Sequence, residues 1–140
     1  MRYVLDTDVI VAALRSPSGA SAALLLAALD RRVTLVANVP LVIEYEATCS
    51  RAEHRQAAGL SEAEVRLFLD GVAALAEPVE THFLWRPRLR DPADEMVLEA
   101  AVNGHAHGIV TFNLRDYGAT PNDFGIEVLK PRDALKSLSQ

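Results

Sequence analysis

Cysteine is almost absent from this sequence, and so are long apolar runs. Cys49 is the only cysteine, so no internal disulfide can form, which fits a reducing cytoplasm. No apolar run approaches the ~20 residues needed to cross a membrane. Asp6 and Asp8 also interrupt the apolar stretch that a signal peptide would need at the N-terminus. We therefore expect a cytoplasmic protein without a membrane partner.

Positive charge is scarce as well. The formal net charge is -5, and Lys130 and Lys136 are the only lysines. This balance argues against a protein that holds nucleic acid mainly by bulk positive charge. A nuclease is not excluded, because a metal site concentrates acidic residues.

Arginines gather in one segment, at Arg86, Arg88 and Arg90, directly after Trp85. Arginine suits forked contacts to phosphate, and an aromatic side chain can stack on a base, so the segment is a candidate RNA-binding loop. The alternative is a proline-containing surface loop with Trp85 packed on the core.

What is present suits a compact α/β domain. Half of the 140 residues are hydrophobic and 24% are charged, which indicates one domain over residues 1–140 with a single core. Apolar, β-branched runs predict strands at 2–6, 33–39, 108–111 and 126–129, with a short strand around Val79 within 77–83. Strands that alternate with helices predict a mostly parallel central sheet flanked by helices.

Capping residues and glycines place the helices. We expect them at 8–14, with Thr7 or Asp8 as N-cap, at 20–29, from Pro40 to about 55, at 61–75, from 91 to 103, and after Pro131. Ser61 and Glu64 form a capping box. Gly104 is expected as the C′ residue that ends the helix from 91.

Acidic residues follow or precede these elements at two distant points, and a third element ends in polar groups. Asp6 ends the first strand, Asp91 and Asp94 open a helix, and the strand at 109–113 ends in Asn113. The carboxyl edge of an open α/β sheet is where ligands and metals bind, and converging carboxylates repel one another unless a cation joins them. The alternative is structural: Asp91 as N-cap and Asp94 in a capping box. Spacing does not separate Glu44 from Glu46 in the helix after Pro40.

Five segments in order resemble the PIN-domain family. Residues 4–9 (VLDTDV) resemble its "hLDTNV" start, residues 41–45 (LVIEY) its first helix Glu, and residues 90–94 (RDPAD) its "RDPxD". Residues 109–117 (IVTFNLRDY) resemble "hVTxNxxDF", and residues 125–131 (GIEVLKP) resemble "GIxhLxP". Each segment is weak alone, but together they span the chain in the family's order.

The resemblance implies a metal-dependent nuclease. It makes Asp6, Glu44 and Asp94 the catalytic acids and ligands of Mg²⁺ or Mn²⁺, with Asp116 as a possible further ligand. Thr111, Asn113, Asp8 and Asp91 would orient the ligands or water. Two positions depart from the pattern: Asn113 stands where many members have Asp, and Asp8 where Asn is usual.

Among PIN domains the chain most resembles VapC-like toxin ribonucleases of type II toxin-antitoxin pairs. That resemblance implies an RNA substrate cut to a 5′-phosphate and a 3′-hydroxyl, a cognate protein antitoxin and a homodimer.

Other interpretations remain open at this point. One is a housekeeping RNA-processing nuclease, and another is a degenerate PIN domain that binds RNA or a partner without cleavage, which Asn113 favours. The Asp6-Thr7-Asp8 triplet also matches haloacid-dehalogenase-type phosphatases, whose mechanism wants a downstream lysine. His105 and His107 lack the further His or Cys that a zinc site needs, so we expect loop or core histidines.

Overall fold

The computed structural model describes residues 1–80 and 88–139, and in this part of the chain five parallel strands form one sheet. The strands stand in the order β3-β2-β1-β4-β5, and every neighbouring pair is parallel. Their bounds are β1 (Arg2–Leu5), β2 (Thr34–Ala37), β3 (Ala76–Pro78), β4 (Gly108–Val110) and β5 (Glu127–Leu129). The predicted α/β fold with a parallel sheet is confirmed.

The strand order places a topological switch point beside β1. The chain leaves β1 for β2 and β3 on one side, and then crosses to β4 and β5 on the other side. In open α/β sheets, ligands bind at the carboxyl ends of the strands beside such a switch point. The backbone N–H of Asp6 donates to the carbonyl of Val110 at 2.9 Å and ties the two strand ends together.

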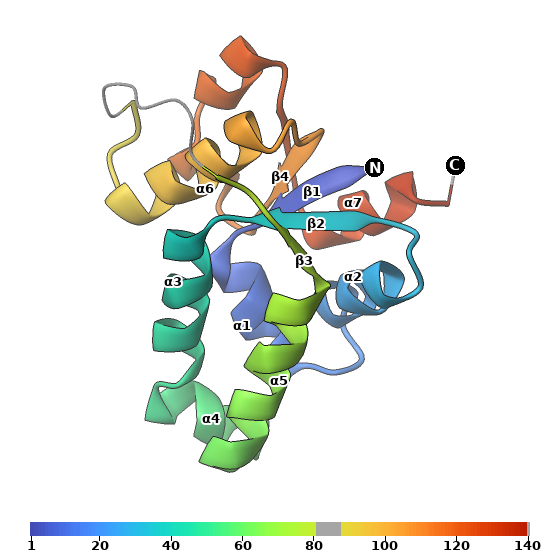
Figure 1. The fold of residues 1–140 in the computed structure, drawn as a ribbon, viewed down its shortest axis with the longest axis vertical. Coiled ribbons are helices and arrows are strands. Elements are labelled where there is room, and N and C mark those ends of the chain that lie inside the picture. The colour runs from blue at the N-terminus through green and yellow to red at the C-terminus, as the bar shows by residue number, and fades with distance from the viewer. Residues whose placement is uncertain (81–87, 140) are drawn as a thin grey trace.

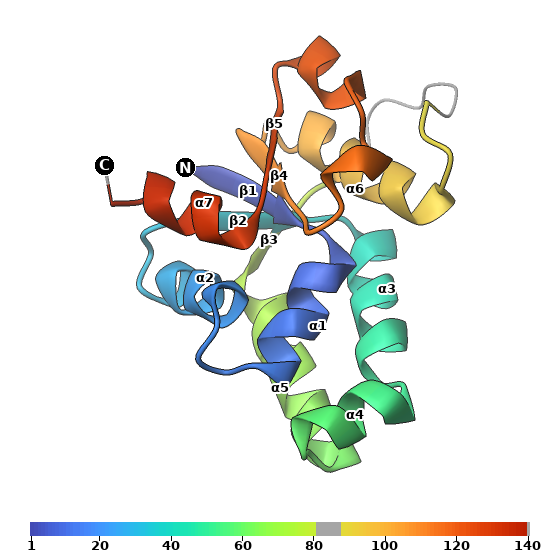
Figure 2. The same ribbon diagram turned by 180° about the vertical axis from the view of Figure 1, so that it is seen from behind.

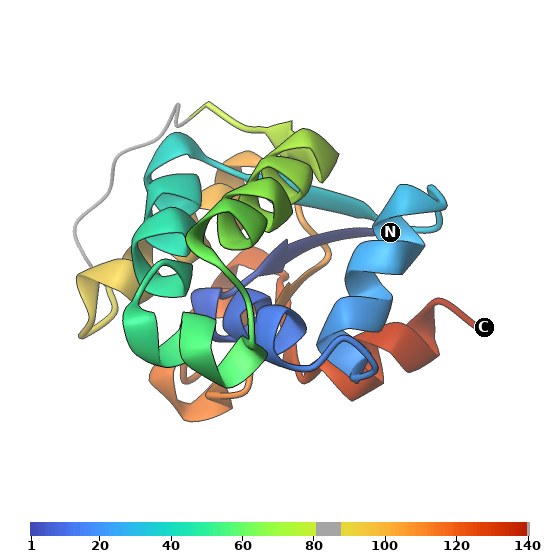
Figure 3. The same cartoon turned by 90° about the horizontal axis from the view of Figure 1, so that it is seen from below.

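Helices cover the sheet on both sides. Figure 1 shows α6 on one side of the sheet, and α1, α4 and α5 on the other. Seen from below, α1 is surrounded by α2, α3 and α4, which all contact it (Figure 3). The bounds are α1 (Thr7–Arg15), α2 (Ala20–Leu29), α3 (Val39–Cys49), α4 (Ala52–Ala58), α5 (Glu62–Leu75), α6 (Pro92–Asn103) and α7 (Pro131–Ser137), with 3₁₀ turns at Leu114–Asp116 and Thr120–Phe124.

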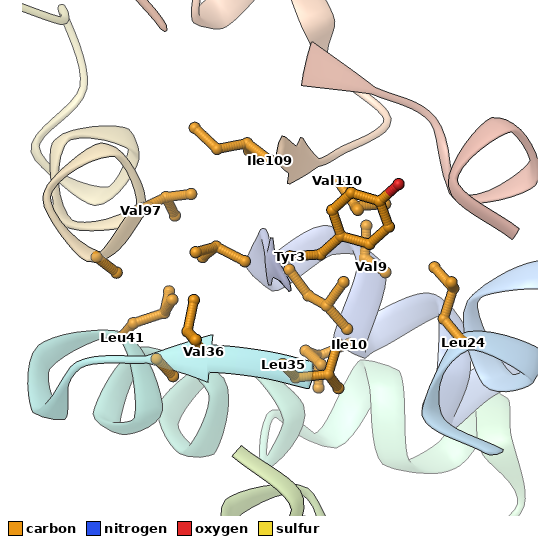
Figure 4. Close-up of a cluster of buried hydrophobic side chains, with 14 of the residues drawn as sticks. Tyr3, Val9, Ile10, Leu24, Leu35, Val36, Leu41, Val97, Ile109 and Val110 are labelled. Carbon is orange, nitrogen blue, oxygen red and sulfur yellow. The ribbon is translucent and has the colours of Figure 1, made fainter. Parts of the chain in front are cut away.

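The core fills the space between the sheet and the helices. Tyr3, Val36 and Ile109 come from three neighbouring strands, and α1 contributes Ile10 and α6 contributes Val97 (Figure 4). Because the three central strands are buried on both faces, they read as continuous apolar runs. Cys49 is fully buried, as expected of a small apolar side chain. Among the described residues, no single helix is long and apolar enough to cross a membrane.

The predicted order of elements is confirmed, and several boundaries were predicted correctly. The helix at 20–29 and the end of α5 at Leu75 agree with the prediction, and Ser61 and Glu64 form the predicted capping box. Asp91 caps α6 by accepting the N–H of Ala93. The strand predicted at 33–39 is shorter, because Asn38 caps α3 and Val39 already belongs to that helix.

Three local predictions were wrong. The N-cap of α1 is Asp6, not Thr7 or Asp8, because the side chain of Asp6 accepts the N–H of Thr7. The helix predicted from Pro40 to about residue 55 is two helices, separated at Ser50 and Arg51. Arg51 has an extended backbone and is the N-cap of α4.

The third wrong prediction concerns Gly104, which was expected as the C′ residue of α6. Its φ is -89°, so it is not the left-handed C′ residue, and His105 takes the positive φ of 52° instead. Space explains the glycine: a Cβ there would lie 2.7 Å from the carbonyl oxygen of Ala100 and 2.9 Å from Val79 Cγ2. The short strand expected around Val79 is β3 at Ala76–Pro78, and the part of that prediction at 81–83 lies outside the described residues, as does Trp85.

Candidate active site at the carboxyl edge of the sheet

Asp6 is the most firmly held acid at the switch point. It is 9% exposed, and its Oδ1 accepts the backbone N–H of Thr7 at 2.8 Å. Its Oδ2 accepts the hydroxyl of Thr111 at 2.8 Å and that of Tyr117 at 2.9 Å. Donors from α1, from the end of β4 and from the following 3₁₀ turn therefore fix one carboxylate where β1 ends.

Asp8 lies beside Asp6 and contacts the loop after β4. Its Oδ2 accepts the backbone N–H of Phe112 at 3.0 Å and the side-chain amide of Asn113 at 3.2 Å. The orange loop that follows β4 approaches the start of α1 in Figure 2. Asp8 Oδ1 is buried and has no hydrogen-bond partner among the described residues. One oxygen of Asp8 is thus held by donors, and the other has none among the described residues.

A pocket of about 680 Å³ brings the third acidic segment to the site. It is lined by Arg90, Asp91 and Asp94 at the start of α6, and by Arg115 and Asp116 from the turn after β4. Asp94 is 8% exposed. Segments that are far apart in the sequence therefore place aspartates around one pocket.

Burial and mutual repulsion raise the pKa values of these acids. Burial is the main cause in each case: it raises the pKa of Asp6 despite the three donors, and with the charge of Asp6 it raises the pKa of Asp8 to about 6. Burial and the charges of Asp6, Asp91 and Asp116 raise the pKa of Asp94 to about 7. None of these aspartates forms an ion pair with a described arginine or lysine. The site carries more negative charge than its neighbours neutralise.

Glu44 lies on α3, next to a residue that contacts the end of β1. The hydroxyl of Tyr45 donates to the carbonyl of Leu5, the residue before Asp6, and so anchors α3 beside the end of β1. Glu44 itself is half-buried and accepts the hydroxyl of Thr48 at 3.1 Å. Glu46, the alternative from sequence, lines a different pocket with α4 and α5. The assignment of Glu44 as a metal ligand stays a prediction.

The described acidic side chains do not form a complete coordination site for a metal ion. In residues 1–80 and 88–139, no group of three or more His, Cys, Asp or Glu side chains lies close enough to hold one metal ion. Asp6, Glu44 and Asp94 are therefore not assembled as three direct ligands of one ion. Further ligands from water or small side-chain rotations would have to complete such a site.

The three arginines proposed for RNA binding differ in their surroundings. Arg90 lines the acidic pocket. Arg88 is held by Asp123 at 2.5 Å and lies 5.4 Å from the centre of the Phe124 ring, so its guanidinium already has partners. Arg86 lies outside the described residues. Of the two described arginines, Arg90 lines this pocket and Arg88 does not.

Sequence reasoning missed three residues of the site. Tyr117 donates to Asp6, and Arg115 lines the acidic pocket. Both lie in the segment 109–117 that resembles a family motif, but the sequence analysis gave neither residue a role. Asn38 is buried, accepts the N–H of Leu41 and donates to the carbonyl of Met96, so it joins α3 to α6. A polar residue between a buried strand and a proline was the available sign of that cap.

The fold is an open, all-parallel α/β sheet with aspartates near its switch point. Proteins of this class bind ligands at the carboxyl ends of the strands. The family model described as PIN domain matches residues 2–115, so the chain belongs to the PIN-domain family. PIN domains are generally nucleases that use divalent metal ions, and the chain therefore has a nuclease fold. No curated protein and no solved structure matches the chain.

The acids present fit a hard divalent cation. Carboxylate oxygens are the ligands that Mg²⁺ and Mn²⁺ prefer. The unpartnered, buried Asp8 Oδ1 and the raised pKa values of Asp8 and Asp94 are what a site shows when its charge is left uncompensated. The assignment of Asp6, Glu44, Asp94 and Asp116 as ligands stays a prediction, and the unpartnered Asp8 Oδ1 is a further candidate oxygen.

Proposed function

We propose that this protein is a Mg²⁺- or Mn²⁺-dependent endoribonuclease and the toxin of a type II toxin-antitoxin pair, resembling VapC proteins. The observation that carries the proposal is that Asp94 of α6 and Asp116 of the turn after β4 line one pocket, that the charge of Asp6 acts on Asp94, and that no described arginine or lysine forms an ion pair with these three aspartates. A cation bound there would lower the pKa of a water and offset charge on the phosphate oxygens.

The chain's own residues supply position and charge. Thr7, Thr111 and Tyr117 hold Asp6 in one orientation, so this acid does not have to reorganise during a reaction. Arg90 and Arg115 line the same pocket and offer guanidinium groups to a phosphodiester. Asp91 caps α6 and so fixes the turn that presents Asp94.

Asn113 does not by itself argue for a degenerate domain. Its side-chain amide donates to Asp8. In this Asn113–Asp8 pair the carboxylate comes from α1, whereas many family members have it after β4. The local negative charge is kept, which supports a working cation site over a binding domain that has lost its chemistry.

The test is a Mn²⁺-dependent cleavage assay on single-stranded RNA with the purified wild type, Asp6→Asn and the control Asp30→Asn. We expect Asp6→Asn to lose cleavage and to keep its fold by circular dichroism, because it removes a charge while keeping the shape. Asp30 is exposed at the end of α2, and its variant should cleave like the wild type. Full activity of Asp6→Asn with a normal Mn²⁺ response would place the site elsewhere.

Expression in a host without an antitoxin separates the biological roles. Growth arrest with the wild type alone supports the toxin assignment, and rescue by a small protein encoded immediately upstream would identify the cognate antitoxin. Cleavage without growth arrest would favour a housekeeping RNA-processing nuclease. Absence of both would favour a degenerate domain. The proposed homodimer is tested by sedimentation of the purified chain.

A further inference from the structure

A second pocket lies beside the acidic site, between α2, α7 and the loop after β4. It has a volume of about 570 Å³, and its lining includes Gly19, Ser21, Phe112, Lys130, Arg132 and Asp133. α2 and α7 contact each other here and lie side by side in Figures 2 and 3. No residue of this pocket has a role in the site described above except through the backbone of Phe112.

The start of α2 offers hydrogen-bond donors to this pocket. Its N-cap is Gly19, which has no side chain, so no side-chain acceptor caps the first turn of this ten-residue helix. Free N–H groups and the helix dipole make such an end attractive to an anion.

Ser21 in that first turn points independently to a ligand. Its side chain is 3% exposed and lines the pocket, yet its Oγ has no hydrogen-bond partner among the described residues. A buried hydroxyl without a partner costs free energy, and an acceptor bound in the pocket would remove that cost.

The pocket is also positive in an acidic protein. Lys130 and Arg132 face one acid, Asp133, whereas the whole chain has a net charge of -5. Lys130 is one of only two lysines. The chemistry of hydroxyl, helix N–H groups and two cations suits a phosphate group.

Phe112 joins this pocket to the acid cluster. Phe112 lines the pocket and is 47% exposed, while its backbone N–H donates to Asp8 Oδ2 at 3.0 Å. An exposed aromatic ring beside a phosphate site is suited to stack on a base. A strand whose phosphate lies in the pocket would therefore run directly to the aspartates.

We propose that this pocket is a substrate subsite that binds one backbone phosphate of the RNA strand, with an adjacent base stacked on Phe112. This inference rests on the proposed ribonuclease function and assigns its substrate a path from Lys130 and Ser21, over Phe112, to Asp8.

The test measures binding of a short fluorescent single-stranded RNA by anisotropy in EDTA, where cleavage is absent. We expect Lys130→Gln/Arg132→Gln to bind about 10-fold more weakly, with the slope of log Kd against log salt reduced by about 0.7 for the lost phosphate contact. Lys136→Gln is the control, because it removes a lysine charge from the same helix outside the pocket.

Three further variants examine the uncharged parts of the subsite. Ser21→Ala keeps α2 helical and should weaken RNA binding several-fold without changing the salt slope, because it removes a neutral donor. Phe112→Ala should weaken binding about 10-fold through lost stacking, and Phe112→Leu, which keeps apolar bulk, should not restore it. Thermal unfolding of each variant checks that the fold is kept.

Failure of this inference and failure of the proposed function give different results. If the wild type binds and cleaves RNA and the four variants bind it equally well, the subsite is overturned and the ribonuclease remains. If the wild type binds no RNA, inorganic phosphate is titrated while the amide signals of residues 20–22 are followed by NMR. Shifts in the wild type that are absent in Ser21→Ala would then show a site for free phosphate, which overturns the RNA-strand assignment.

Discussion

Asn113 donates its side-chain amide to Asp8, and this contact decides what a substitution at 113 does. An aspartate there would lose the donor and place a second carboxylate beside a first. Without a cation this repulsion destabilises the fold, and with a cation it adds a ligand.

We therefore expect Asn113→Asp to lower the melting temperature in EDTA and to show a larger Mn²⁺-induced rise than the wild type. Scanning calorimetry with and without Mn²⁺ measures both. Asn122→Asp adds the same charge at an exposed position and should show neither effect. An unchanged response of Asn113→Asp to Mn²⁺ would put residue 113 outside the reach of the ion.

Tyr117 acts on Asp6 through its hydroxyl, which donates to Asp6 Oδ2 at 2.9 Å. Tyr117→Phe keeps the buried ring and removes one donor from a buried acid. Hydrogen bonds to charged groups are worth about 1.5–3 kcal/mol, so we expect a loss of stability of that order at neutral pH and a further rise in the pKa of Asp6. Urea unfolding and an NMR titration of the Asp6 carboxyl carbon check the two effects; an unchanged titration would mean that the hydroxyl does not act on Asp6.

At the scale of elements, α6 packs closely on the sheet because one of its ends is a glycine. Gly104→Ala would place a Cβ 2.7 Å from a backbone oxygen of the same helix end and 2.9 Å from Val79 Cγ2. We expect a loss of about 1–3 kcal/mol in the free energy of unfolding, as for other overpacked sites.

Gly71 provides the matched comparison. It lies on the exposed side of α5, and an added Cβ would meet nothing within 4 Å. Gly71→Ala should stabilise the protein by about 0.5–1 kcal/mol, because alanine is the better helix former. Urea unfolding of both variants gives the two signs; equal effects would contradict the packing argument for Gly104.

Element boundaries were predicted well where local chemistry decides them. The capping box at Ser61 and the cap at Asp91 depend on residues a few positions apart, and the sequence displays them. The break between α3 and α4 has no proline or glycine to mark it. The choice of Asp6 as N-cap likewise depends on where β1 must end to pair with β4, which is a tertiary condition.

For the molecule as a whole, the uncompensated acids make stability depend on pH. The pKa of Asp94 is raised to about 7 and that of Asp8 to about 6, from an ordinary value of 3.8. Between the ordinary pKa of 3.8 and these raised pKa values, the folded state binds more protons than the unfolded state. The free energy of unfolding therefore falls as pH rises from about 4 to about 7. A cation bound at the proposed site would offset this loss at neutral pH.

We expect the metal-free wild type to lose stability across this window relative to Asp94→Asn, which removes the Asp94 contribution. Melting temperatures of both proteins in EDTA from pH 4.5 to 8 measure the difference, which should grow with pH. Asp30→Asn should follow the wild type. A difference between the wild type and Asp94→Asn that does not change with pH would mean that Asp94 does not titrate in this range.

The sequence by itself determined the α/β class and the order of elements, because strand runs, caps and ordered motifs are local patterns; its choice of acids for the site stays a prediction. It also placed Asp6 at a strand end, since an apolar run that stops at a carboxylate needs no distant information. Only the tertiary structure decided which residues meet. Tyr117 contacts Asp6 and Asn113 contacts Asp8, while Arg115 lines the same pocket as Asp94, and in each case the segments are distant in the sequence. The physical reason is that pKa values, unpartnered oxygens and pockets arise from burial and from neighbours, and both are set by how the strands pair rather than by spacing along the chain.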